Sequence, residues 1–257
     1  MGGEPGIPGR WAGMTPLVDL HNHVLPGVDD GARDEDESLW MLRIAEEEGI
    51  GLIAATPHSH RCDPDAVGPG VARLNALALA AGLAVRVVPG SEHRLASGLA
   101  ERYRAGQALT LNGGRAILIE LTFDGGWPSY LHRVVAELQA LGLRPILAHA
   151  ERYDAVQRDP APLHALIAAG VPIQINATSL IGAAERGARA TAERLIRDRM
   201  AHLIASDAHN ATGRAPRLRA ALTRAAELAG DEYAAWMAEA AGLLVQDEPL
   251  TLPTPEG

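Results

Sequence analysis

Two histidines one residue apart, followed by two aspartates, stand near the start of the chain in DLHNHVLPGVDDG, residues 19–31. In a β-strand, side chains alternate between two faces, so His21 and His23 would point the same way. Two imidazoles on one face can bind one metal ion, and Asp30 on the following loop offers a carboxylate. The stretch predicts metal chemistry, provided that further ligands lie close by.

Further polar groups of the same kinds follow apolar runs along the chain. These runs, which predict seven buried parallel strands, lie at residues 16–23, 51–58, 84–92, 115–121, 144–150, 171–177 and 201–209. Six of them carry His, Asp or Glu at or just beyond their last apolar residues. Beyond the first strand, the groups are His58, Glu92, Glu120, His149, Asp207 and His209.

The segments between the runs must position these groups. Residues 36–49, 128–142 and 163–170 carry apolar residues at helical spacing and end at Gly, a usual helix stop. Alternating strands and helices predict an α/β fold with a parallel sheet, and seven units predict a distorted TIM-like (β/α)7 barrel. Because the carboxyl ends of barrel strands share one face, the polar groups should converge there.

Convergence gives weight to residues that would mean little alone. A single histidine at a strand end is more often a hydrogen-bonded structural group than a ligand, and we assign His132, His164 and His202 to that class. Crowded carboxylates and imidazoles without a cation would repel one another or lie buried at a cost of several kcal/mol per ion. Nitrogen and oxygen ligands favour Mn, Fe or Zn.

Nucleophilic catalysis by a side chain is a weaker interpretation. Cys62 is the only cysteine, and thiolate phosphatases place an Arg six residues later, where this chain has Gly68. The sequence also lacks a Gly-x-Ser-x-Gly elbow and a phosphate-binding glycine-rich loop.

Composition limits the classes of partner and compartment. The chain has 257 residues, a formal charge of −9 and one cysteine, so we expect no nucleic-acid binding, no disulfide and a cytoplasmic location. No apolar run is long enough for a membrane helix. Glycine- and proline-rich ends predict a disordered extension over residues 1–14, with Met14 an alternative start to Met1, and a flexible tail over 247–257. One domain should span residues 15–246.

Seven stretches together resemble the polymerase and histidinol phosphatase (PHP) superfamily, and within it the manganese-dependent bacterial protein-tyrosine phosphatases of capsule and exopolysaccharide loci. The resemblance covers residues 18–214 and rests on DLHNHVLPGVDDGARDEDESL, ATPH, PGSEHRL, LIEL, PILAHAERYD, QINATSLIG, and ASDAHN followed by GR. It implies a seven-stranded barrel of the PHP type holding three divalent metals.

The resemblance also implies roles for single residues. His21, His23, Glu92 and Asp207 would bind the first metal, with Glu92 bridging to a second metal completed by Glu120 and His149. Asp30, His58 and His209 would bind the third, and Arg152 and Arg214 would hold phosphate. His93 departs from the family pattern and either faces away, which we favour, or lies near substrate.

The implied activity is hydrolysis of phosphotyrosine on proteins, such as a bacterial tyrosine autokinase, by a hydroxide that bridges two metals. A phenol leaves more readily than an alkoxide, so little acid assistance is needed; His58, His60 and a metal-bound water are candidate acids. Asp19 could orient a ligand imidazole or only hold the strand start, and Asn176 and Ser179 could bind substrate or order their loop. Two alternatives stay open: a PHP-type phosphatase of histidinol phosphate or a nucleotide, and a noncatalytic PHP scaffold.

Overall fold

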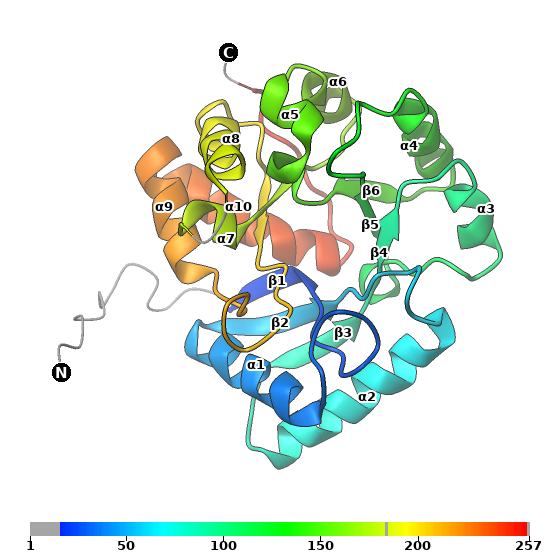
Figure 1. The fold of residues 1–257 in the computed structure, drawn as a ribbon, viewed down its shortest axis with the longest axis vertical. Coiled ribbons are helices and arrows are strands. Elements are labelled where there is room, and N and C mark those ends of the chain that lie inside the picture. Colours follow the sequence, from blue (N-terminus) through cyan, green and yellow to red (C-terminus); the bar gives the residue numbers. More distant parts are fainter. Residues whose placement is uncertain (1–15, 183–184, 256–257) are drawn as a thin grey trace.

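The computed structural model describes residues 16–182 and 185–255, and the extension predicted for residues 1–14 lies outside them. Strands and helices alternate along the chain, as the apolar runs predict, and Figure 1 shows the strands near the centre with helices around them. The strands are β1 (Leu17–Asn22), β2 (Ile50–Ala55), β3 (Arg86–Pro89), β4 (Glu92–Arg94), β5 (Ala116–Glu120), β6 (Arg144–Leu147), β7 (Gln174–Asn176) and β8 (Leu203–Ala205).

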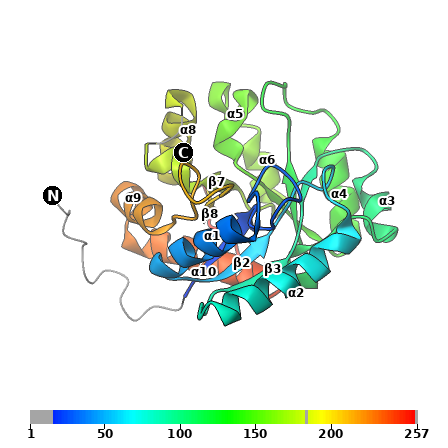
Figure 2. The same ribbon diagram turned by 60° about the horizontal axis from the view of Figure 1, so that its bottom comes forward.

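Helices connect the strands and cover their outer side. In Figures 1 and 2, α1 and α2 lie along β1–β3, while α4, α5 and α8 lie on the other side of the molecule. The α-helices are α1 (Glu35–Glu47), α2 (Pro64–Ala80), α3 (Leu99–Arg104), α4 (Leu131–Ala140), α5 (Asp154–Arg158), α6 (Leu163–Ala168), α7 (Ala177–Leu180), α8 (Arg186–Arg197), α9 (Arg219–Ala229) and α10 (Asp231–Val245), with short 3-10 turns η1 (Leu111–Gly113) and η2 (Ala150–Arg152).

The strands form three parallel sheets, β1-β2-β3, β4-β5-β6 and β7-β8, and the distorted seven-stranded barrel stays a prediction. The run predicted as one strand over 84–92 is split, because β3 pairs with β2 whereas β4 pairs with β5. Gly90 lies at the break, where an added Cβ would meet Leu111 Cδ2 at 2.8 Å. Isolated parallel bridges join the sheets: Asn22 with Ala208, His58 with Glu92 and Leu147 with Ile173.

Alternate residues of the strands pack into two different apolar clusters. Leu118 of β5 and Ile146 of β6 belong to a smaller cluster that includes Leu244 of α10, whereas their neighbours Ile117 and Leu147 pack into the larger cluster with the surrounding helices. Both faces of these strands are therefore buried, which explains why their sequences read as continuous apolar runs rather than alternating ones.

Local signals define the helix that follows the first strand. Asp34 caps α1, and its side chain accepts a hydrogen bond from the Glu37 N–H over 2.9 Å.

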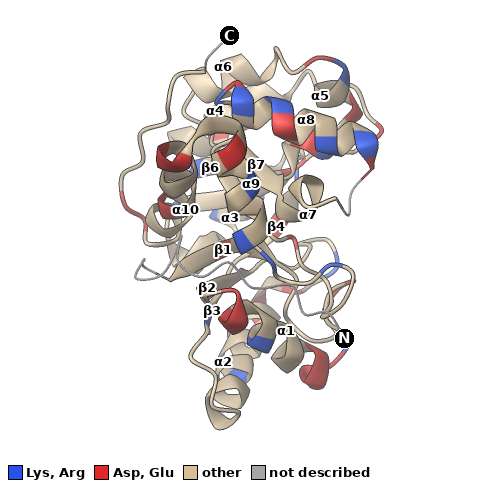
Figure 3. Ribbon diagram, turned by 90° about the vertical axis from the view of Figure 1, so that its left-hand side faces the viewer, with Lys and Arg blue, Asp and Glu red and all other residues tan. Residues whose placement is uncertain are grey.

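Helix α8 carries exposed arginines beside acidic residues (Figure 3), and Arg189 and Arg197 both pair with Glu193 one turn away. None of the described helices is long and apolar enough to cross a membrane.

The chain keeps contact with the body of the protein past residue 246, where the tail was predicted to begin. Asp247 Oδ2 lies 3.0 Å from Arg115 Nε, and Arg144 donates a hydrogen bond to the Glu248 carbonyl. Leu250 packs against the smaller apolar cluster. These contacts form because Arg115 directly precedes β5 and Arg144 begins β6, and both side chains reach the segment that follows α10.

Candidate metal centre and adjoining cavity

All nine residues predicted as metal ligands lie in one connected group. They come from β1 and β5, from the first residue of β4, and from the segments that follow β1, β2, β6 and β8. Groups of potential donor atoms within 4.8 Å of one another comprise His21, His23 and Glu92; Glu92, Glu120 and His149; and His23, Asp30, His58 and His209.

His21 and His23 face one another, and the Nδ1 atom of each ring already has a hydrogen-bond partner. His21 Nδ1 donates to Gln174 Oε1 over 3.0 Å, and His23 Nδ1 donates to Asp29 Oδ2 over 2.7 Å. The two Nε2 atoms lie 3.3 Å apart, and in neutral imidazoles both would present lone pairs. A cation or a shared proton is needed between them.

Glu92 is the buried centre of the group. Its Oε1 lies 2.7 Å from His149 Nε2, and its Oε2 lies 2.8 Å from His58 Nδ1. Burial raises the pKa of Glu92, but the nearby histidines, His21 first, outweigh it and hold the pKa well below its usual range. Glu120 nearby is protonated more easily, because burial and the charge of Glu92 raise its pKa to about 7.

Several atoms of the group are buried without a hydrogen-bond partner. They include Glu120 Oε1, and also Glu92 Oε2 and His58 Nδ1, which lie close to one another but without the alignment of a hydrogen bond. Unpartnered buried carboxylate oxygens are costly, and a divalent cation satisfies them together with the facing imidazole nitrogens. The donor set of imidazoles and carboxylates without thiolate therefore fits Mn, Fe or Zn.

The outer part of the group is more open to solvent. His58 Nε2 lies 3.4 Å from Asp30 Oδ1, and His209 Nε2 lies 3.9 Å from the same oxygen. The Asp30 side chain is 46% exposed, so this part can exchange ligands with water. His60 also lies near, within reach of His58 and Glu120.

Two of the candidate ligands have unusual backbone conformations. His149 has φ 32° and Asp207 has φ 49°, in the left-handed region that non-glycine residues rarely adopt. Both residues lie two positions beyond the end of a strand, β6 or β8, where the turn directs the side chain toward the group. Strain of this kind persists where the surrounding structure over-determines it, which is common at functional sites.

Asp207 links the ligand group to the two predicted phosphate-binding arginines. Its Oδ1 lies 3.5 Å from both His21 Nε2 and His23 Nε2. Its Oδ2 accepts hydrogen bonds from Arg214 Nη2 over 2.7 Å and from Asn176 Nδ2 over 2.7 Å, while Arg152 Nη1 lies 3.4 Å away. Burial raises the pKa of Asp207, but His21 and then Arg214 outweigh it, so the carboxyl stays ionised.

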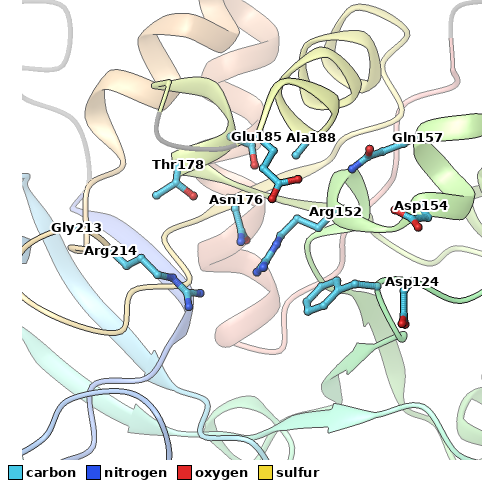
Figure 4. Close-up of a pocket in the computed structure, with 12 residues that line it drawn as sticks. Asp124, Arg152, Asp154, Gln157, Asn176, Thr178, Glu185, Ala188, Gly213 and Arg214 are labelled. Atoms are coloured by element: carbon cyan, nitrogen blue, oxygen red, sulfur yellow. The ribbon is translucent and has the colours of Figure 1, made fainter.

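A cavity of about 440 Å³ opens beside these arginines. In Figure 4 the guanidinium groups of Arg152 and Arg214 extend toward one another with Asn176 between them. Phe123, Asp124, Thr178 and Ser179 also line the cavity. The arrangement puts two cationic groups next to a candidate multi-metal centre, which suits an anionic phosphate ester.

The sequence matches the family described as capsular polysaccharide synthesis, CpsB/CapC, over residues 17–242. The chain belongs to this family. It is 33% identical over 244 residues to tyrosine-protein phosphatase YwqE of Bacillus subtilis, covering 93% of this chain and 96% of YwqE. It is 26% identical over 209 residues to tyrosine-protein phosphatase CpsB of Streptococcus agalactiae serotype V, covering 78% of this chain and 86% of CpsB.

A solved structure agrees with these matches. It is described as "Crystal structures of YwqE from Bacillus subtilis and CpsB from Streptococcus pneumoniae, unique metal-dependent tyrosine phosphatases", and it matches with a TM-score of 0.90 at 33% identity. The match covers 93% of this chain and 98% of that one. The resemblance predicted from sequence, to tyrosine phosphatases of capsule loci, is confirmed.

The structure of this CpsB/CapC member also reveals residues that sequence reasoning missed. Asp29, next to the predicted ligand Asp30, binds His23 and also accepts the His58 N–H over 2.9 Å. Burial raises its pKa, but the hydrogen bond and charge of His23 outweigh that effect and lower it. Gln174 orients His21 and accepts the His149 N–H over 3.2 Å. Such partners fix the orientation of ligands in metal sites.

Glu151 is a third missed residue and lies wholly buried behind the cavity. Its Oε1 accepts hydrogen bonds from Ser179 Oγ over 2.6 Å and from the Asn176 N–H over 3.1 Å. Burial raises its pKa to about 7. Asn176 in turn binds Asp207, so Glu151 orders the loop that carries a contact to the candidate centre. The sequence feature that could have identified Glu151 is its position next to Arg152 in HAERY.

The residues with two sequence interpretations also have definite places in this family member. His93 Nε2 donates to the Leu109 carbonyl over 2.9 Å, so His93 faces away from the ligand group. Asp19 accepts the Ser206 N–H over 2.9 Å and holds β1 to the segment after β8, with no ligand imidazole as its hydrogen-bond partner among the described contacts. The pKa of Cys62 is raised by burial and by nearby aspartates, which makes its thiolate harder to form.

Proposed function

We propose that the chain hydrolyses phosphotyrosine monoesters on proteins with the help of divalent metal ions. The observation that carries this proposal is the joining of a His, Asp and Glu donor group to Arg152 and Arg214 through Asp207, at the edge of a cavity. The CpsB/CapC relatives named tyrosine-protein phosphatases support the substrate class. A cluster of this kind supplies charge stabilisation, which phosphoryl transfer requires above all.

We assign three divalent ions to the three donor groups, with Mn preferred to Fe and Zn. The first is proposed for His21, His23, Glu92 and Asp207, the second for Glu92, Glu120 and His149, and the third for Asp30, His58 and His209. The close approach of these donor atoms and the unpartnered oxygens of Glu92 and Glu120 support the assignment. When bound, such cations lower the pKa of water and offset charge on phosphate oxygens.

The protein's own side chains bind and orient the ester. Each guanidinium has five N–H donors, and the contacts of Arg214 with Asp207 leave some of them for phosphate oxygens. Two guanidinium groups match the geometry of a phosphate better than two ammonium groups would. His60 is a poor acid at neutral pH, because burial and the charge of Arg94 lower its pKa. A phenol leaving group needs little such assistance.

The remaining proposals concern the whole protein. The isolated bridges between sheets and the two-sided packing of the strands support a distorted seven-stranded barrel of the PHP type. We further propose a bacterial tyrosine autokinase as the substrate, on the strength of the family. The single cysteine supports a cytoplasmic location, since reducing compartments disfavour disulfides.

Chelation and substitution together test the function. The protein as purified should hydrolyse phosphotyrosine peptides, lose the activity in EDTA, regain it with Mn²⁺ and be little affected by vanadate. Arg152→Ala should lower kcat/KM by roughly 10²–10³-fold, since a donor to the transition state is lost. Full activity after chelation, in protein that metal analysis shows to be metal-free, would overturn the proposal. A higher kcat/KM for histidinol phosphate or a nucleotide than for phosphotyrosine peptides would reassign the substrate. A scaffold would show no hydrolysis at all.

A further inference from the structure

Phe123 is the only phenylalanine of the chain and lines the cavity beside the arginines. Its side chain is 38% exposed, in the loop between β5 and α4. The Arg152 Cζ atom lies 4.3 Å from the centre of its ring. An exposed aromatic ring directly under a phosphate-binding guanidinium is the feature that the proposed reaction leaves unexplained.

Packing and hydrogen bonds fix the position of this ring. It stacks on Tyr153 with ring centres 5.8 Å apart and an interplanar angle of 25°. The Tyr153 hydroxyl accepts the Leu121 N–H over 2.9 Å and donates to the Ala148 carbonyl over 2.8 Å, which anchors the start of the loop. The Phe123 carbonyl accepts the Asp154 N–H over 2.9 Å. The ring is therefore held in place before any substrate arrives.

We infer that Phe123 is a specificity-determining residue that favours aryl over alkyl phosphates, an inference that rests on the proposed function. A phosphate held by Arg152 and Arg214 brings its ester group into the cavity that Phe123 lines. The ring of a phosphotyrosine can then contact Phe123 in an offset or edge-to-face arrangement, which aromatic pairs prefer. The shorter side chains of phosphoserine and phosphothreonine offer no ring for this contact.

The alternative role for Phe123 is support of the site itself, through its cation–π contact with Arg152 and its ring contact with His149, whose ring centre lies 5.3 Å away. That role would affect every phosphate ester equally, because all of them need the guanidinium. The ratio of aryl to alkyl binding separates the two roles. Because this ratio compares binding and not hydrolysis, the greater intrinsic reactivity of a phenyl ester does not affect it.

Calorimetry on the Mn²⁺-loaded protein measures this ratio without needing turnover. Phenylphosphonate and methylphosphonate are titrated into wild type, Phe123→Leu and Phe123→Tyr. Phe123→Leu should reduce the preference for phenylphosphonate by roughly three- to tenfold, and Phe123→Tyr should retain it. Tyr130→Leu is the matched control, because Tyr130 is 37% exposed but is not among the residues that line the cavity.

The outcomes distinguish failure of the inference from failure of the proposed function. An unchanged ratio in Phe123→Leu, or an equal loss for both phosphonates, overturns the role of Phe123. Wild type that prefers phenylphosphonate but does not hydrolyse phosphotyrosine peptides overturns the function and leaves the aryl site supported. Circular dichroism and metal content of each variant establish that fold and loading are retained.

Discussion

At the scale of single residues, the candidate centre depends on groups that hold the ligands as well as on the ligands themselves. Asp29 shows this most clearly, because one carboxylate receives the His23 ring N–H and the backbone N–H groups of His58 and Gly31. It thereby fixes the His23 tautomer that leaves Nε2 free for a cation. Asp29 and Asp30 are adjacent in sequence but have different tasks.

Replacing Asp29 should weaken metal binding more than it weakens the fold. Asp29→Asn removes the negative charge and one acceptor facing His23, so we expect affinity for Mn²⁺ to fall by about 10–100-fold. Activity measured against free Mn²⁺ concentration should show the shift and recover at saturating metal. Asp34→Asn is the control, because Asp34 caps α1 and has no contact with the ligand group among its described hydrogen bonds. Identical Mn²⁺ half-saturation in Asp29→Asn and wild type would contradict this role.

At the scale of elements, the loop between β1 and α1 carries Asp29 and Asp30 and is tightly packed. Gly31 in this loop has no room for a side chain, since an added Cβ would lie 2.0 Å from the His23 carbonyl oxygen and 2.5 Å from its Cβ. The His23 carbonyl also accepts the Ala32 N–H over 3.0 Å. Loop and strand end are therefore held together around a candidate ligand.

A single methyl group at Gly31 should disturb both stability and metal binding. Gly31→Ala must shift backbone near His23, and we expect it to lower the free energy of unfolding by about 1–3 kcal/mol and to reduce Mn²⁺ affinity. Thermal unfolding with and without Mn²⁺ measures both effects. Gly70→Ala, inside α2, where the added Cβ would make only ordinary contact with Leu25 Cδ2 at 3.6 Å, should be neutral or slightly stabilising. If the two variants had the same stability and the same Mn²⁺ affinity, the loop would be able to accommodate a side chain at Gly31.

The same elements show what the sequence could and could not predict. Apolar runs ending in His, Asp or Glu located every candidate ligand except Asp30, which lies on the loop after the first run, because parallel strands bring their carboxyl ends together. The break at Gly90 was not predicted, since it depends on which neighbour each half of the run pairs with. Glu151 and Gln174 were missed for a similar reason: their partners are Ser179 and His21, far away along the chain.

At the scale of the whole molecule, burial affects the titration of histidines well away from the candidate centre. His202 lies just before β8, fully buried, with its ring edge-on to Trp236 of α10. Its Nδ1 accepts the Ile173 N–H over 3.1 Å, and its Nε2 has no hydrogen-bond partner. Burial lowers the pKa of His202 to about 4, so the folded protein keeps it neutral.

The free energy of unfolding should therefore fall as the pH falls from about 6.5 to about 4. Over this range His202 becomes protonated in the unfolded chain but stays neutral in the folded protein, so acid favours unfolding. The full loss below pH ~4 is on the order of 3 kcal/mol, from a shift of 6.5 to about 4. His202→Asn keeps an acceptor for Ile173 but does not titrate, so its stability relative to wild type should improve steadily as pH drops.

Denaturant unfolding of both proteins between pH 8 and pH 4, with metal removed from each, measures the difference. Subtracting one curve from the other cancels the titration of the ligand group and of buried His93, which both proteins share. His164→Asn, a change at an exposed histidine of α6, controls for loss of any histidine and should run parallel to wild type. A constant difference between His202→Asn and wild type at every pH would show that water or a proton reaches this ring in the folded state, and that the packing of α10 against β8 does not exclude charge.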